Sequence, residues 1–226
     1  MSTQAGYCYY HPHPAITADV VILTIRNKQL QVLLIERKSA PFQGKWALPG
    51  GFLDLNETLR QCASRELQEE TGVSGVFLEQ LYTFGSPERD PRERVVSGAY
   101  YALIPSDRLH LRAATDAAAV GWYAMDNLPE LGFDHGKIIA VAQQRLIAKL
   151  DYSTIAFQFM PGEFTLSELQ SVYEIILNAE LDKRNFRKWV LALEQIEETG
   201  KERKDGAYRP AKLYRLINPD RVDIIK

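Results

Sequence analysis

The spacing of apolar and polar residues divides the first 150 positions of the chain into strands and helices. β-Branched and leucine-rich runs at 16–25 and 30–35 predict two strands joined by a turn at Asn27-Lys28. Further strands are expected at 76–84, 95–103 and 120–123, and helices are expected at 57–71 and 137–150. Strands on both sides of helices indicate an α/β sandwich with a mixed sheet.

The helix expected at 57–71 carries start and stop signals. Ahead of it, Trp46-Ala-Leu-Pro-Gly-Gly51 is a turn signal that follows a short strand. No Gly or Pro interrupts the helix, Asn56 can cap its start, and Gly72 can cap its end. This arrangement places Glu57 in the first turn.

A different pattern begins after residue 150. Residues 151–163 are interpreted as a linker that contains a Pro-Gly turn. Thr165 and Glu168 form a capping box for a helix with one apolar face, made of Leu166, Leu169, Val172, Tyr173, Ile176 and Leu177. Asp182 can cap a second helix, and Asp205-Gly206 predicts a hairpin between 201–204 and 208–216. The chain therefore divides into an N-terminal segment (1–15), an α/β domain (16–150), the linker (151–163) and a C-terminal domain (164–226).

Composition narrows the class of protein. Of 226 residues, 46% are hydrophobic and 25% are charged, and the net charge of -2 excludes a globally basic nucleic-acid coat. Cys8 and Cys62 form no metal-ligand spacing, which favours a reducing compartment. The sequence shows no signal-peptide core in residues 1–14 and no apolar run of transmembrane length. We therefore expect a cytoplasmic protein without a membrane partner.

Three carboxylates stand together on the helix expected at 57–71. Glu66, Glu69 and Glu70 lie at i, i+3 and i+4, which places them on one helical face, where they repel one another. A hard cation such as Mg²⁺ relieves this repulsion, and Arg65 can hold one carboxylate in place. A solvated acidic helix face is the alternative, but it would not require glycines before the helix.

The same segment resembles a known family. Gly51, Glu57 and the run Arg65-Glu-Leu-Gln-Glu-Glu-Thr-Gly-Val73 match the Nudix box at every defined position. The resemblance implies a Nudix α/β/α sandwich that uses Mg²⁺ or Mn²⁺ to hydrolyse a nucleoside diphosphate linked to another group. It implies metal ligation at Glu66, Glu69, Glu70 and Gly51, and catalytic or supporting roles for Glu57, Arg65, Glu69 and Glu70.

Residues outside the box are candidates for the ligand and the catalytic base. We expect the substrate-binding residues to include Arg37, Trp46, Gly50 and Arg89, although Arg37 is equally well explained as a surface residue that ends a strand. An extra base in such enzymes often comes from a loop, and the sequence leaves three candidates open: Glu88, Asp90 and Glu93. Pro87 lies where ADP-ribose pyrophosphatases of this family carry a proline, which is a weak marker for that substrate.

The C-terminal domain combines two helices, a hairpin and clustered cations. This pattern is typical of a winged helix-turn-helix domain, with DNA contacts expected from Lys183, Arg184, Asn185, Arg187, Lys188, Arg209 and Lys212. A small dimerisation module with a mixed-charge surface is the alternative. Segments 164–170, 182–187 and 209–214 resemble the winged-helix domain of NrtR-like Nudix-related regulators. Such regulators control genes of NAD and sugar metabolism and sense ADP-ribose or related phosphorylated sugars.

Two functions follow from these resemblances. In the first, the protein hydrolyses ADP-ribose to AMP and ribose 5-phosphate and also binds double-stranded operator DNA, most simply as a homodimer on a palindrome. In the second, it is a repressor that senses ADP-ribose without hydrolysing it. Because no defined box position has been lost, the sequence favours the first.

Overall fold

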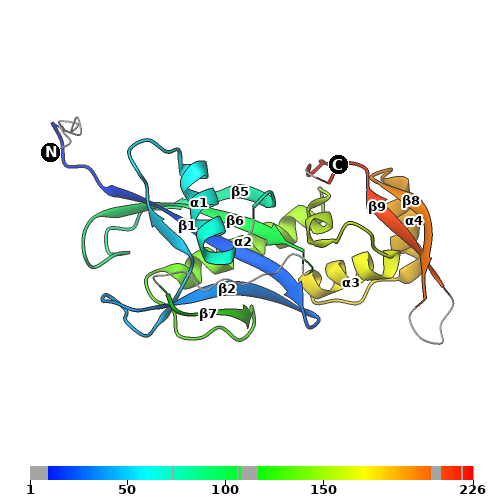
Figure 1. The fold of residues 1–226 in the computed structure, drawn as a ribbon, viewed down its shortest axis with the longest axis horizontal. Coiled ribbons are helices and arrows are strands. Elements are labelled where there is room, and N and C mark those ends of the chain that lie inside the picture. The colour runs from blue at the N-terminus through cyan, green and yellow to red at the C-terminus, as the bar shows by residue number, and fades with distance from the viewer. Residues whose placement is uncertain are drawn as a thin grey trace.

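The computed structural model describes residues 10–72, 74–105, 107, 117–204, 210–219 and 221–225. Figure 1 shows a large sheet with α1 and α2 at one end of the long axis, and α3, α4, β8 and β9 at the other. We call these two parts the sheet region (residues 15–150) and the winged-helix region (residues 164–216). Over the described residues, no helix is both long and apolar enough to cross a membrane.

The large sheet is mixed, as predicted. Its strands are β1 (Ala15–Arg26), β2 (Gln29–Arg37), β3 (Trp46–Ala47), β4 (Gly50–Phe52), β5 (Phe77–Phe84), β6 (Val95–Ile104) and β7 (Ala117–Ala124). The main order is β3-β2-β1-β6-β5, with β4 paired to β1 and β7 paired to β2. β1 and β6 are parallel, whereas the other pairs are antiparallel. Asn27 and Lys28 both have positive φ, as the two-residue turn between β1 and β2 requires.

Side chains alternate along β1, so its two faces contribute to two different cores. Even-numbered residues such as Val20 and Ile22 pack against α1 (Leu59–Thr71), through the buried side chains of Cys62, Ala63 and Leu67. Odd-numbered residues such as Val21 and Leu23 belong to the cluster that includes α2 (His135–Leu150), through Ile138, Ala142 and Leu146. This arrangement confirms the α/β/α sandwich.

The start of α1 differs from the sequence prediction. Thr58, not Asn56, is the N-cap, and its hydroxyl accepts from the backbone N–H of Gln61 while the Gln61 side chain accepts from the backbone N–H of Thr58. Glu57 therefore lies just before the helix. At the other end, Gly72 caps the helix with a φ of 68°, as predicted. The last box residue, Val73, lies outside the described residues.

The segment expected to be a linker contains a short 3₁₀ helix. Residues Ile155–Phe159 form this helix, and Ile155, Phe157 and Phe159 are buried. They belong to one apolar cluster that also includes α2 and the winged-helix region. The segment therefore packs the two regions against each other, although the predicted domain boundaries stay a prediction.

The winged-helix region has the predicted order of elements. It contains α3 (Leu166–Leu177), α4 (Lys183–Ala192), β8 (Ile196–Arg203) and β9 (Ala211–Leu216). The capping box of Thr165 and Glu168 and the Asp182 cap are both confirmed. Two details were wrong: β8 begins earlier than predicted, at Ile196, and Leu177 is 37% exposed instead of buried. The expected turn at Asp205-Gly206 and the candidate Arg209 lie outside the described residues.

Candidate functional site

The three box glutamates share one helix but have different surroundings. Glu66 and Glu70 are buried, each 8% exposed. The side chain of Glu69 is 56% exposed. Although the three glutamates are close in sequence, the structure buries the side chains of Glu66 and Glu70 and leaves that of Glu69 at the surface.

Space alone explains both glycines ahead of α1. A Cβ at Gly51 would lie 2.1 Å from Glu66 Oε1, so the carboxylate occupies the position that any side chain would need. A Cβ at Gly50 would lie 2.5 Å from the carbonyl oxygen of Ala18 and 2.7 Å from Asp19 Oδ1. The glycines allow β4 to pass between a box carboxylate and a carboxylate of β1.

Arg65 connects the acidic residues of the site. Its Nη1 donates to Glu66 Oε1 at 2.6 Å, and its Nη2 donates to Glu57 Oε1 at 2.8 Å. Glu69 Oε2 is at the edge of hydrogen-bonding range, 3.5 Å from Nη1, and the carbonyl of Phe52 accepts from Nη2 at 3.3 Å. One guanidinium thus offsets part of the repulsion among these carboxylates and holds the Glu66 carboxylate in place.

These contacts shift the pKa values of the site in opposite directions. Hydrogen bonds from Arg65 and from the backbone N–H of Asp54 lower the pKa of Glu57 to about 2. Burial raises the pKa of Glu66, and Arg65 opposes that shift. Burial and the nearby Glu57 raise the pKa of the Cys62 thiol to about 12, so Cys62 is a neutral core residue.

The donor set has the chemistry of a Mg²⁺ or Mn²⁺ site. All candidate ligands are oxygens: the carboxylates of Glu66, Glu69 and Glu70, and the backbone carbonyl of Gly51. Within the described residues, however, no three carboxylate, imidazole or thiolate side chains converge on one point. Mg²⁺ usually takes one or two protein carboxylates and completes its shell with water and substrate phosphates. The two buried glutamates fit that mode of binding.

A second buried network, missed by the sequence prediction, lies on the other side of β4. Arg89 Nη2 donates to Asp19 Oδ2 at 3.0 Å and to Asp134 Oδ1 at 2.9 Å, and Ser97 Oγ donates to Asp19 Oδ2 at 2.6 Å. Only 3% of the Arg89 side chain is exposed. Arg89 was expected to bind substrate, but here two carboxylates engage its guanidinium. The sequence signal that could have revealed this network is Asp19, a carboxylate within an apolar strand.

The network also fixes the first turn of α2. Asp134 occupies the N-cap position but makes no capping hydrogen bond, because its carboxylate binds Arg89. His135 Nδ1 accepts from the backbone N–H of Leu48 at 2.8 Å. Burial lowers the pKa of His135, so the ring is neutral, with Nε2 3.9 Å from Asp19 Oδ1. The start of α2 is thereby tied to the segment that leads into Gly50.

The remaining ligand and base candidates are placed as follows. Arg37 Nε donates to the carbonyl of Pro41 at 2.8 Å, and the half-buried Trp46 packs edge-on against Tyr123 with ring centroids 4.7 Å apart. Asp90 is buried and binds Arg92, whereas Glu88 and Glu93 are exposed. The choice of catalytic base therefore stays open.

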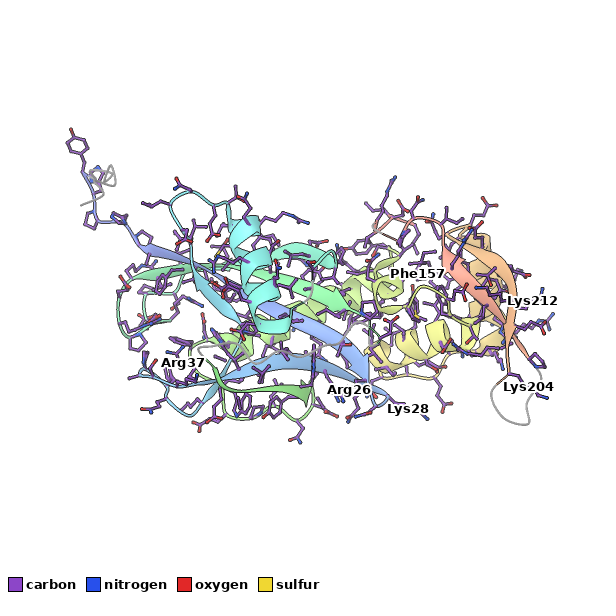
Figure 2. All side chains as sticks on the ribbon, viewed as in Figure 1. Arg26, Lys28, Arg37, Phe157, Lys204 and Lys212 are labelled. Atoms are coloured by element: carbon purple, nitrogen blue, oxygen red, sulfur yellow. The ribbon has the colours of Figure 1, made fainter. Side chains whose placement is uncertain are left out.

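The candidate DNA contacts lie at the far end of the molecule. Arg37 and Lys212 are at opposite ends of the long axis (Figure 2). On α4, all five candidates are exposed: Lys183, Arg184, Asn185, Arg187 and Lys188. Arg187 Nη2 lies 3.4 Å from Ser167 Oγ, and Lys212 Nζ pairs with the two Glu198 oxygens at 2.9 and 3.0 Å. The cations of α4 are therefore better placed to meet a phosphate than the paired Lys212.

Two family models match the chain. One, described as a NUDIX domain, matches residues 15–142. The other, described as an NrtR DNA-binding winged helix domain, matches residues 156–216. Together they cover residues 15–142 of the sheet region and the whole of the winged-helix region.

Three relatives illustrate these matches. An ADPR responsive transcriptional repressor from Acinetobacter baylyi is 38% identical over 93% of this chain and 85% of its own length. An ADP-ribose pyrophosphatase from Methanocaldococcus jannaschii is 40% identical over 56% of this chain and 72% of its own length. The crystal structure of Shewanella oneidensis NrtR with a 27mer DNA is 36% identical, covers 91% of this chain and 94% of that one, and has a TM-score of 0.82. The NUDIX domain of the Shewanella protein, solved with ADP ribose, covers 60% of this chain and 90% of that one at 36% identity, with a TM-score of 0.55.

Proposed function

The chain belongs to the Nudix family and ends in a winged-helix domain of the NrtR type, and from this premise we propose that it is an ADP-ribose-responsive DNA-binding regulator that also hydrolyses its ligand. The reaction is hydrolysis of ADP-ribose: water adds across the phosphoanhydride bond and gives AMP and ribose 5-phosphate. The DNA partner is a double-stranded operator, bound by a homodimer.

The observation that carries the hydrolase proposal is the ordered contact between Gly51, Glu66, Arg65 and Glu57. Glu66 fits against a glycine backbone that leaves room for nothing else, and Arg65 holds it there while it also binds Glu57. Such pre-positioning is costly to keep in a protein that has no use for the carboxylate, because burial disfavours the charged form.

The residues of the site have different roles in the proposed hydrolysis. A divalent cation, when bound, would supply charge neutralisation for the diphosphate and a bound water of lowered pKa. Glu66, Glu69, Glu70 and the carbonyl of Gly51 would hold it. Arg65 and Glu57 keep the first of these carboxylates oriented. The base that accepts the proton of the attacking water comes from Glu88, Asp90 or Glu93.

The regulatory half of the proposal rests on the relatives and on the exposed cations of α4. The Acinetobacter repressor responds to ADP-ribose, and the Shewanella regulator has been solved with DNA and, as a Nudix domain, with ADP-ribose. Four exposed cations near the start of α4 suit the phosphates beside a major groove. A cytoplasmic location agrees with this role.

One observation favours the second candidate, a sensor that does not hydrolyse its ligand. The side chain of Glu69 is 56% exposed, so the structure buries only Glu66 and Glu70 of the three box glutamates. A ligand bound at such a site would be recognised but cleaved slowly or not at all.

The test measures AMP release from ADP-ribose with Mg²⁺. The panel of substrates also includes NADH, a dinucleoside polyphosphate and a sugar nucleotide. Glu70→Gln is the site variant, and Glu130→Gln is the control, because Glu130 is exposed and pairs with Lys45. We expect AMP release by the wild type and the control, and at least a 100-fold lower rate for Glu70→Gln.

A second measurement separates the two candidates. Binding to duplexes selected from a random-sequence pool is followed by fluorescence anisotropy, with and without ADP-ribose. ADP-ribose that alters DNA affinity without AMP release identifies a sensor. AMP release without DNA binding at low salt would show that the winged-helix region has another role.

A further inference from the structure

Two guanidinium groups approach the same aromatic ring near the box. Arg37 ends β2, and Arg92 belongs to the loop between β5 and β6. Their Cζ atoms lie 4.8 Å and 5.6 Å from the centroid of the Phe133 ring. Phe133 itself is held by Phe42, whose ring meets it edge-on at 4.8 Å, and has a φ of 53°. The fold therefore maintains an unusual backbone conformation that places this ring within cation–π distance of both guanidinium groups.

The carboxylates near this ring act mainly on Arg92 and less on Arg37. Arg92 makes a two-point contact with Asp90, at 3.0 Å from Nε and 2.7 Å from Nη2. Glu93 acts on Arg92 at longer range, so two carboxylates offset Arg92, whereas the Nε and Nη2 hydrogen bonds of Arg37 go to carbonyl oxygens. Burial and the neighbouring Arg92 both lower the pKa of Arg37, so the two cations repel each other in the folded protein. An anion that reaches both guanidinium groups would offset that repulsion.

Hydrogen bonds hold both guanidinium groups in place, and the Nη1 of each remains able to donate to a ligand. Arg37 is fixed by its Nε and Nη2, which donate to the carbonyls of Pro41 and Ser39. Arg92 is fixed by Asp90. Over the residues that the structure describes, no hydrogen bond uses Nη1 of either arginine. Pre-oriented guanidinium donors suit the oxygens of a phosphate group.

The cluster lies beside the box but on the other side of β4. The Arg92 Cζ is also 5.7 Å from the ring of Phe52, which is 43% exposed and follows Gly51. Because side chains alternate along a strand, Phe52 and the Glu66 carboxylate against Gly51 lie on opposite sides of β4. The arginines would therefore bind a part of the ligand that the box glutamates do not reach.

We propose that Arg37 and Arg92, backed by Phe133, form a subsite for phosphate oxyanions of the nucleoside diphosphate ligand, separate from the metal-binding glutamates. The identity of the ligand rests on the proposed function, whereas the anion site itself does not. The subsite gives a diphosphate an affinity that is independent of metal, which suits a sensor that binds intact ligand.

The test is calorimetric titration with ADP-ribose and with inorganic pyrophosphate in the presence of EDTA, so that no metal ion can hold the phosphates at the glutamates. Arg37→Gln and Arg92→Gln remove one guanidinium each. Arg94→Gln is the matched control, because Arg94 lies in the same loop, is exposed, and donates to the carbonyls of Ser86 and Val95. We expect each site variant to weaken both ligands about 10- to 100-fold, and the control to stay within about two-fold of wild type.

Three results would overturn the subsite: wild-type affinity in both site variants, equal losses in Arg92→Gln and Arg94→Gln, or no pyrophosphate binding by the wild type. Failure of the wild type to bind ADP-ribose, with pyrophosphate binding that Arg92→Gln abolishes, would instead contradict the proposed ligand and support the anion site. Circular dichroism shows whether each variant is folded. Should Arg92→Gln not fold, Arg92→Lys, which keeps the charge but not the planar donor fork, is expected to bind both ligands at least five-fold more weakly.

Discussion

The ion pairs around Arg89 in the sheet region and those of the winged-helix region have similar lengths but very different surroundings. Arg89 lies 3.0 Å from Asp19 and 2.9 Å from Asp134, and these three side chains are only 3 to 12% exposed. In the winged-helix region, Lys212 lies 2.9 Å from Glu198 and Arg215 lies 2.7 Å from Glu197, with side chains 49 to 60% exposed.

Burial, not distance, therefore distinguishes the two sets of charges. Around Arg89, water cannot replace a lost partner, so each charge depends on the others to stay in place. In the winged-helix region, water and salt compete for every pair, and a lysine can leave a glutamate for a DNA phosphate at little cost. The first set fixes the geometry of a site, whereas the second is suited to exchange partners when DNA binds.

The largest effect is expected for Arg89→Ala. This change leaves the buried carboxylates of Asp19 and Asp134 without their cation, and it should lower the free energy of unfolding by about 3–5 kcal/mol. Urea denaturation measures the loss. Arg94→Ala, an exposed arginine of the same loop, serves as the control and should change stability by less than about 0.5 kcal/mol. Equal effects of the two changes would contradict the distinction between buried and exposed charges.

An effect of intermediate size is expected from pH and His135. Burial lowers the pKa of His135 in the folded state, so below about pH 6.5 only the unfolded chain takes up a proton there. Stability is therefore full above pH 6.5, and His135 should reduce it by up to about 1.4 kcal/mol per pH unit as the pH falls. The free energy of unfolding, measured by denaturation at pH 7.5, 6 and 5, should change less with pH for His135→Gln than for wild type. His11→Gln is the control and should behave like wild type, since His11 is exposed. If the free energy of unfolding changed with pH as steeply in His135→Gln as in wild type, His135 would not contribute to the pH dependence.

A smaller effect is expected at the start of α3, where a buried hydroxyl caps the helix. Thr165, only 6% exposed, caps α3 by accepting from the backbone N–H of Glu168. Thr165→Ala should lower the free energy of unfolding by about 1 kcal/mol, measured by urea denaturation. Thr165→Ser keeps the hydroxyl and should recover most of this loss. A Ser variant as unstable as the Ala variant would show that the methyl group, not the cap, is responsible.

The smallest effect on stability is expected for Lys212→Ala. Lys212 and Glu198 are exposed, so the melting temperature should not change measurably. If Lys212 contacts a DNA phosphate, the change should weaken binding to all duplexes alike and reduce the slope of log affinity against log salt by about 1. An unchanged salt slope would place Lys212 outside the DNA interface. Lys183→Ala, on α4, provides the comparison for a cation that has no carboxylate partner among the described residues.

Much of the fold and part of the site followed from local patterns. Alternation along β1 and β2, helical spacing in α1 and the capping box of Thr165 predicted their elements, because each depends on residues a few positions apart. The contact of Arg65 with Glu57 and Glu66 was also predictable, since one short segment holds all three residues.

The sequence alone identified the Nudix family, because the carboxylates and glycines of the box lie within 23 residues of one another. Tertiary structure decided which charges are buried and what they bind. Asp19, Arg89 and Asp134 are up to 115 positions apart, and only the pairing of β1 with β6 and the packing of α2 bring them together. Likewise, Arg37 at the end of β2 and Arg92 in the loop between β5 and β6 share a ring because both segments approach Phe133. Contacts between distant segments have no local pattern, since they arise from the packing of whole elements.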